Sequence, residues 1–149
     1  MTDYADKPSE IAENPMAKAT IERITCGNRD ASVFLWRFWC FMHAFDDLID
    51  RDKPVSADEA IRELVLFLQE ISFNLFYNAH KSSLFGFITM VANRAIVGEQ
   101  WKVGTEPQKS ASAAVRCGDL DLYAHIAFLC GGWDHMRNLD PEIRVLDKE

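Results

Sequence analysis

The feature that most constrains the fold is a run of bulky apolar residues, 33–45, that leads directly into Asp-Asp-Leu-Ile-Asp at residues 46–50. No Pro or Gly interrupts residues 31–50, so this segment is predicted to be one helix with Asp30 as its N-cap. The helix is apolar around nearly its whole circumference, which is typical of a helix buried among other helices. Its aromatic side chains are therefore expected to form core rather than a substrate site; they are Trp36, Phe38, Trp39, Phe41 and Phe45.

Length and charge narrow the class of protein. A chain of 149 residues has room for one domain with a sizeable core. The net charge of −7, with no cluster of basic residues, argues against a nucleic-acid partner. Four cysteines without a C-x-x-C pair, a polar N-terminus and no apolar run of membrane-spanning length together predict a soluble, cytoplasmic protein with no membrane contact.

Helical signals continue along the rest of the chain. Gly27-Asn28 closes a short helix at 17–26, and a capping box, Ser56 with Glu59, begins a helix that extends to about residue 77. A polar break at 78–83 precedes a helix at 84–103, and further helices are expected at 108–117 and 119–130, where Gly131-Gly132 kinks or ends the chain's last long helix. The apolar positions of the capping-box helix recur at helical spacing; they are Ile61, Leu64, Val65, Leu68, Ile71, Leu75 and Phe76.

These elements predict an all-α fold, a compact bundle of five or six helices around one buried aromatic-rich helix. We expect a polar N-terminal arm at 1–16, the helical bundle domain at 17–140 and a C-terminal tail at 141–149. Generous apolar faces also indicate a homo-oligomer or a protein partner.

The acidic end of the 31–50 helix is the first candidate site. His43, Asp46, Asp47 and Asp50 are spaced i, i+3, i+4 and i+7, along one side of the helix. Carboxylates this close repel one another, and Mg²⁺ or Mn²⁺ is the simplest compensating charge. The alternative is an ordinary solvated last turn, compensated by the basic residues at 51 and 53.

A magnesium ion needs ligands from a second element, and Glu99 is the best candidate. Glu99 falls on the stripe of the 84–103 helix that is expected to be buried, and an acid on such a face needs a partner. The residues that define this stripe are Ile88, Ala92, Ala95 and Val103. Glu99 therefore faces either the metal or an arginine, such as Arg37 or Arg94.

Neighbouring polar side chains on the same helix complete the predicted site. Asn93 and Gln100 are placed to orient water or substrate, and Arg94 or Lys102 to add a positive contact to phosphate. Trp101, near the helix end, is expected to line an opening.

The histidines remain open to several interpretations. His43 is a metal ligand, a group that orients a carboxylate, or a histidine satisfied by a backbone carbonyl, and the last is favoured. His125, four residues after Asp121, and His135 after Asp134 form weaker pairs, and the sequence does not show whether His43 and His125 face one cavity.

Asp46-Asp47-Leu48-Ile49-Asp50, at the end of an aromatic-rich helix, resembles the D-D-x-x-D motif of class I isoprenyl diphosphate and terpene synthases. That resemblance implies magnesium ions bound by the motif and gripping a diphosphate. Counted from Asn93, the second metal motif of that family is not matched, because Val97 and Trp101 stand at its other positions. The size of the chain and the set of Asp46, Asp50 and Glu99 are also similar to the all-α nucleoside triphosphate pyrophosphohydrolases.

The sequence thus predicts a magnesium-dependent helical protein that acts on or binds a diphosphate or nucleotide, with Asp46, Asp47, Asp50 and Glu99 as metal ligands. An enzyme of this kind would be of hydrolase or lyase type, and its partner a small phosphorylated molecule. The alternative, from a different class, is a non-catalytic accessory or regulatory protein that binds another protein through its acidic or apolar faces.

Overall fold

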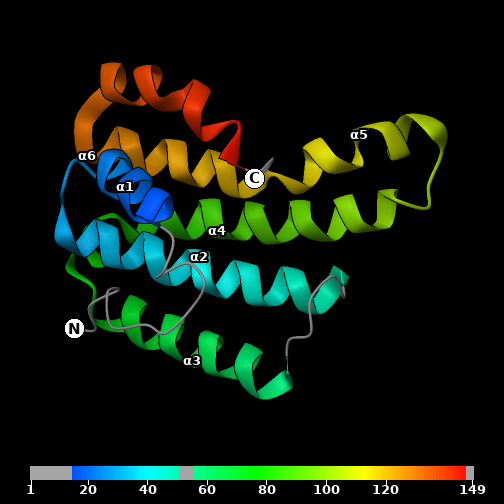
Figure 1. The fold of residues 1–149 in the computed structure, drawn as a ribbon, viewed down its shortest axis with the longest axis horizontal. Helices are drawn as coiled ribbons and strands as arrows, with labels where there is room; N and C mark the ends of the chain where they lie inside the picture. The colour runs from blue at the N-terminus through cyan, green and yellow to red at the C-terminus, as the bar shows by residue number, and fades with distance from the viewer. Residues whose placement is uncertain (1–14, 51–55, 147–149) are drawn as a thin grey trace. The chain divides into compact units, whose positions relative to one another are not determined.

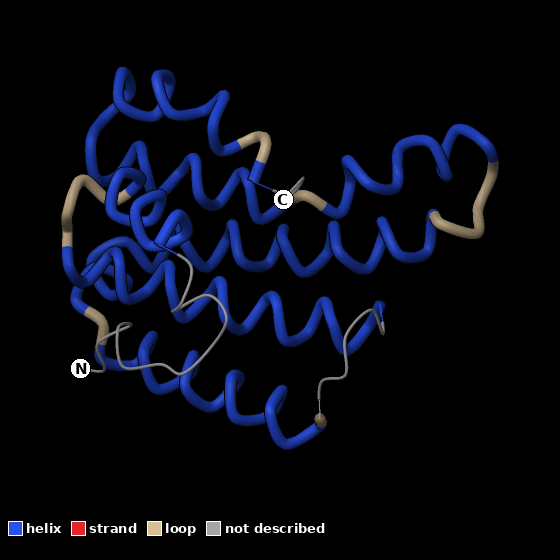
Figure 2. The backbone as a smooth tube through the Cα atoms, viewed as in Figure 1, coloured by secondary structure: helices blue, strands red, loops and turns tan. Residues whose placement is uncertain are grey.

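The computed structural model describes residues 15–50 and 56–146, and this part of the chain is helical with no strand (Figures 1 and 2). Its helices are α1 Pro15–Ile24, α2 Arg29–Asp50, α3 Ala57–Phe73, α4 Leu75–Trp101, α5 Glu106–Arg116 and α6 Gly118–Ile143. The predicted all-α class is confirmed. None of the helices in these ranges is both long and apolar enough to cross a membrane.

The chain divides into two compact units, a first unit of Met1–Ala79 and a second unit of His80–Glu149. The division falls at a kink inside α4, where His80 leaves helical geometry with φ −120° and ψ 15°. The kink lies in the predicted polar break at 78–83, although α4 starts at Leu75, earlier than expected. α6 continues to the buried Ile143, past the predicted tail boundary at 140, and the predicted arm lies almost wholly outside the described residues.

The aromatic face of α2 forms the core of the first unit. Every residue from 31 to 40 is buried except Trp39, as expected for a helix that is apolar all round. The ring of Phe67 on α3 contacts three α2 rings, with centroids 6.2 Å from Phe34, 5.9 Å from Phe38 and 5.2 Å from Phe41. α2 and α3 therefore lie side by side through interlocking rings (Figure 1).

The link between α1 and α2 is a tight turn fixed by short polar side chains. Cys26 and Gly27 adopt positive φ, 52° and 72°, and the Gly27 N–H donates to Glu22 O at 3.0 Å, which caps the end of α1. The helix that follows begins at Arg29, because Asn28 Oδ1 accepts from the Ala31 N–H at 3.0 Å. The N-cap of α2 is thus Asn28, and the predicted N-cap, Asp30, lies two residues further along the chain.

Asn74 connects α3 to α4 and to α2. Its Nδ2 donates to the Asp30 backbone oxygen at 2.8 Å and to Glu70 Oε1 at 3.0 Å. Its Oδ1 accepts from the Tyr77 N–H at 2.8 Å, as an N-cap does, and its own N–H donates to Glu70 O at 2.8 Å. One fully buried amide therefore ends α3, begins α4 and attaches both to the start of α2.

In the second unit, the buried side of α4 repeats every seven residues, at Leu84, Val91 and Gly98. The guanidinium of Arg94, on the same side, donates to the Val115 and Ala114 carbonyls at the end of α5, at 3.0 and 2.9 Å. A cation at this helix end satisfies carbonyls that have no partner within the helix. These hydrogen bonds join α4 to α5. Leu122 and Ile126 are the fully buried side chains that α6 contributes to the core of this unit.

Replacing Asn74 with Ala should lower the free energy of unfolding by roughly 2–3 kcal/mol, because Glu70 and the Asp30 carbonyl would lose a buried donor. Urea unfolding measures this loss. Asn138→Ala, at an exposed position of α6, is the control and should change stability by less than about 0.5 kcal/mol. Equal effects of the two substitutions would contradict the role given to Asn74.

Candidate functional site

The acidic turn predicted to hold magnesium lies at the end of α2. Asp46 is exposed and Asp47 half-buried, and the last turn of α2 contains no basic residue. The side chain of Asp50 and the basic residues at 51 and 53 lie outside the described residues. Within residues 15–50 and 56–146, no group of three or more His, Cys, Asp or Glu side chains is arranged to hold a metal ion.

Glu99, the predicted ligand from a second helix, has basic partners of its own. Its Oε2 lies 2.8 Å from Lys102 Nζ and 3.9 Å from Arg116 Nε on α5. The sequence left open an ion pair with an arginine, and the arginine is Arg116 rather than Arg37 or Arg94. Glu99 belongs to the second unit and Asp46 to the first, so a metal site shared by the two stays a prediction.

The stripe of α4 on which Glu99 was placed is not the buried one. Val103 is 86% exposed, Ala92 is exposed, and Ile88 and Ala95 are half-buried. The heptad positions 84, 91 and 98 are buried instead. On this side α5 approaches α4 at Gly98, and the start of α6 approaches α4 at Gly118. A Cβ at Gly98 would collide with Arg116, and one at Gly118 would press on Arg94 and Val91.

The four predicted substrate-binding residues, all on α4 or just after it, differ in their exposure and in their partners. Asn93 and Gln100 are exposed, and Lys102 pairs with Glu99. Arg94 is engaged by two backbone carbonyls and by the Asp121 carboxylate, so its charge is used within the fold.

His43 is satisfied locally, as the favoured interpretation held, although its ring is exposed rather than buried. Its Nε2 accepts from the Trp39 indole N–H at 3.1 Å, and its Nδ1 lies 3.0 Å from Trp39 O. Because Nε2 accepts, the ring proton belongs on Nδ1, which donates to the carbonyl. This geometry leaves no ring nitrogen directed at the acidic turn.

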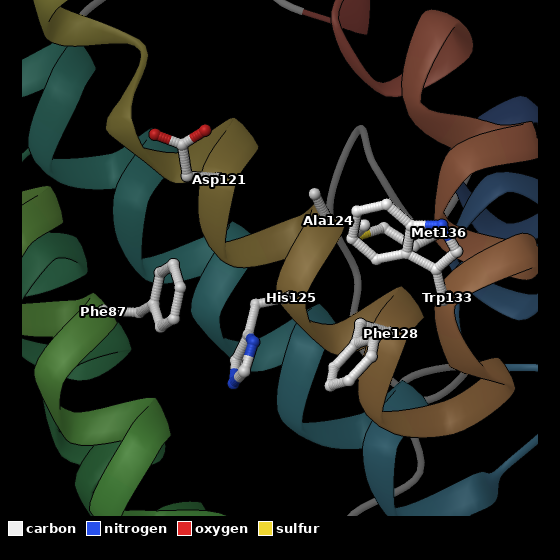
Figure 3. Close-up of a pocket in the computed structure, with 7 residues that line it drawn as sticks. All are labelled: Phe87, Asp121, Ala124, His125, Phe128, Trp133 and Met136. Atoms are coloured by element: carbon white, nitrogen blue, oxygen red, sulfur yellow. The ribbon is translucent and has the colours of Figure 1, made fainter.

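A groove of about 440 Å³ opens on the second unit (Figure 3). Its walls are mainly apolar and aromatic, with one carboxylate and one imidazole among them. The lining residues come from α4 and both halves of α6: Phe87, Asp121, Ala124, His125, Phe128, Trp133 and Met136. The sequence pairs Asp121 with His125 by their spacing, but it does not predict this groove or its aromatic wall.

The double glycine of α6 creates this groove. Gly132 has φ 85° and ψ −175°, a conformation that only glycine adopts readily, and there the helix folds back on itself (Figure 1). A Cβ at Gly131 would collide with the His135 ring. The predicted kink is confirmed, and it brings Trp133 and Met136 opposite Phe128 and Ala124 (Figure 3).

Ion pairs close one end of the groove. Asp121 accepts from Arg94 Nη1 at 2.5 Å and from Arg144 Nη1 at 2.7 Å, and Arg144 also pairs with Asp140 at 3.2 Å. The hydrogen bond with Asp121 raises the pKa of Arg144 above its ordinary value. Two arginines thus balance two aspartates, which ties α4, the start of α6 and the end of α6 together.

His125 lines the groove between Phe87 and Phe128. Its ring stacks on Phe87 at 4.3 Å between centroids, and its Nε2 lies 3.1 Å from Ser83 Oγ. Ser83 Oγ in turn donates to His80 O at 3.2 Å, so the proton between the two side chains belongs to the imidazole. Burial, and then the charge of His80, lower the pKa of His125 below its ordinary 6.5.

The second candidate surface is the outer face of α3. The side of α3 that meets α2 contains Glu63, 3% exposed, and Glu70, 6% exposed, around Phe67. The opposite side presents Ile61, Val65 and Leu68, which are 58%, 45% and 49% exposed. The amphipathic pattern predicted from sequence is present, but its apolar side faces outward.

Comparisons with known proteins give no assignment for either surface. No family model matches the chain, and neither the curated proteins nor the solved structures gave a significant match. The resemblance to class I synthases therefore stays a prediction based on five residues.

The lowered pKa of His125 predicts a pH dependence of stability. The unfolded state binds a proton at His125 as the pH falls through 6.5, while the folded state resists protonation. The free energy of unfolding therefore falls as the pH drops below 6.5 and has its full value above that pH. Urea unfolding at pH 7.5 and 5.5 should show His125→Gln losing less stability on acidification than the wild type. The control is His43→Gln, and a wild-type-like loss in His125→Gln would contradict the assignment.

Proposed function

We propose that this chain is a non-catalytic helical protein that acts by binding another polypeptide, and that α3 is its contact helix. The single observation that supports this function is the orientation of α3, with two glutamates inward and three large aliphatic side chains outward. A helix held this way leaves apolar area in water, which is typical of a surface that a partner covers. The partner that we propose is a second copy of the chain.

The charges of α3 favour an antiparallel pair. Asp58 and Glu59 occupy the exposed first turn, whereas the exposed polar side chains of the last turns, Gln69 and Ser72, are uncharged. A parallel pair would place the acidic turns together, and like charges at that spacing repel. In an antiparallel pair Ile61 of one copy meets Leu68 of the other, and Val65 faces its own copy across a two-fold axis.

The magnitude of the apolar contact sets the expected affinity. Full burial of one such side chain contributes about 1.5–3 kcal/mol, and about half of each of the six is still exposed. The contact is therefore worth roughly 5–9 kcal/mol, comparable with the association cost of about 4–15 kcal/mol. We expect a dimer that depends on protein concentration rather than a permanent one.

Charge at the two-fold axis tests this arrangement. Val65→Asp and Val65→Lys should each be monomeric, because each places two like charges opposite one another, and an equimolar mixture of the two should form a heterodimer. Sedimentation equilibrium measures the three masses alongside the wild type.

The control for this experiment is Val145→Asp. The exposed fraction of Val145, 48%, is similar to the 45% of Val65, but Val145 lies outside α3. It should dimerise as the wild type does. A monomeric wild type at all concentrations, or a mixture that stays monomeric, would sink the proposed dimer.

Magnesium-dependent binding of a diphosphate or nucleotide at Asp46, Asp47 and Asp50 is a second candidate. The observation that favours it is the last turn of α2, where exposed and half-exposed carboxylates oppose the helix macrodipole with no basic residue in the turn. Magnesium would neutralise both the carboxylates and the phosphate oxygens.

Thermal melting tests whether magnesium binds at the acidic turn of α2. With magnesium at about 100 times its Kd, stabilisation of about 2.7 kcal/mol should raise the Tm by several degrees, and further with added inorganic diphosphate. Asp46→Asn should remove the shift, while Asp134→Asn, at an exposed acid of the second unit, should keep it. If magnesium does not raise the Tm of the wild type, the metal site is ruled out and only the polypeptide-binding function remains.

A further inference from the structure

We propose that the groove of the second unit binds an uncharged, planar aromatic molecule that carries one N–H or O–H donor. This site is independent of the contact helix α3, because every residue that lines it belongs to residues 87–136. Its volume of about 440 Å³ is within the range of small-molecule sites.

The walls favour a flat ring. Phe87 and His125 are already stacked, with their planes at 16°, and His125 and Phe128 lie at 23°. Trp133, an exposed indole, and the adaptable side chain of Met136 stand on the other half of α6 (Figure 3). A planar ligand between these two halves would stack on aromatic faces without displacing any of them.

The charges at the groove exclude an ionic ligand. Asp121 is engaged by Arg94 and Arg144, and Arg144 is shared with Asp140, so these charges already balance one another. Arg137 lies over the Trp133 ring, 6.0 Å from its centroid, and does not line the groove. A charged ligand would therefore lose hydration without gaining an unpaired counter-ion.

His125 provides the polar contact that selects a donor. Its Nε2 donates to Ser83, so its Nδ1 has a lone pair, which makes no hydrogen bond to any residue of the described ranges. In Figure 3 one ring nitrogen of His125 lies on the side of Phe128. An N–H or O–H of the ligand would satisfy this acceptor, as expected of a site that fixes orientation by a few polar groups.

Indole and 1-methylindole test the proposal, because they differ in the donor, and indole-3-carboxylate adds a charge. At pH 7.5, NMR titration should show saturable shifts around Phe87 and Phe128, with indole binding about tenfold tighter than 1-methylindole. Indole-3-carboxylate should bind more weakly than indole. Phe128→Ala should lose at least tenfold in affinity, whereas Phe85→Ala, at an exposed phenylalanine outside the groove, should not.

His125→Phe separates the acceptor from the walls, since it keeps the stacked ring on Phe87 and removes the nitrogen. It should bind 1-methylindole as the wild type does and lose the preference for indole. The proposal is overturned by unsaturable binding, by tighter binding of the carboxylate, or by wild-type affinity in Phe128→Ala. Retained preference in His125→Phe, or shifts at the groove that depend on protein concentration alone, would also overturn it.

Discussion

The orientation of α3 depends on one buried amide, Asn74, and the surface of the first unit follows from it. Asn74 binds the Glu70 carboxylate and the Asp30 carbonyl at the same time, so α3 is held to α2 by its polar side. Phe67 completes the contact by packing among the α2 rings. Buried polar groups of this kind stabilise little on balance, but they select one arrangement over others. The arrangement selected here leaves Ile61, Val65 and Leu68 in water.

The second unit is organised by a different polar contact with a similar effect. Arg94 donates to two carbonyls at the end of α5 and pairs with the Asp121 carboxylate. Arg144, at the end of α6, pairs with the same carboxylate. These bonds fix where α6 begins and where it returns. Gly132 supplies the turn between the two positions, and the aromatic groove is the space enclosed by that turn.

The sequence predicts much of the local structure, because helix starts, ends and kinks depend on neighbouring residues. The buried α2, the cap at Ser56, whose Oγ accepts from the Glu59 N–H at 3.1 Å, and the kink at the double glycine were all predicted and are present. The direction in which an amphipathic helix faces is a tertiary property. For α3 the signal was available, since Glu63 and Glu70 are seven residues apart on the face of Phe67.

The candidate sites were less predictable for the same reason. Glu99 was assigned to a buried stripe from its spacing to Val103, but the buried side of α4 is set by Gly98, which lets Arg116 approach. The groove joins residues on either side of a reversal at Gly132, and a linear pattern does not show which side chains a reversal brings together. The acidic turn of α2 remains the part of the metal prediction that experiment can decide.

The central claim is that α3 faces α2 with its glutamates and presents its aliphatic side chains outward. Methyl and aromatic NMR of the dilute monomer, with a soluble paramagnetic agent, measures this directly. The agent should strongly attenuate the NMR signals of the Ile61 and Leu68 methyl groups. The ring protons of Phe67 should be protected to the same degree as the methyl groups of Leu84, which is fully buried and serves as the reference. Protected Ile61 and Leu68 beside an attenuated Phe67 would mean that α3 is turned the other way, and would contradict the account.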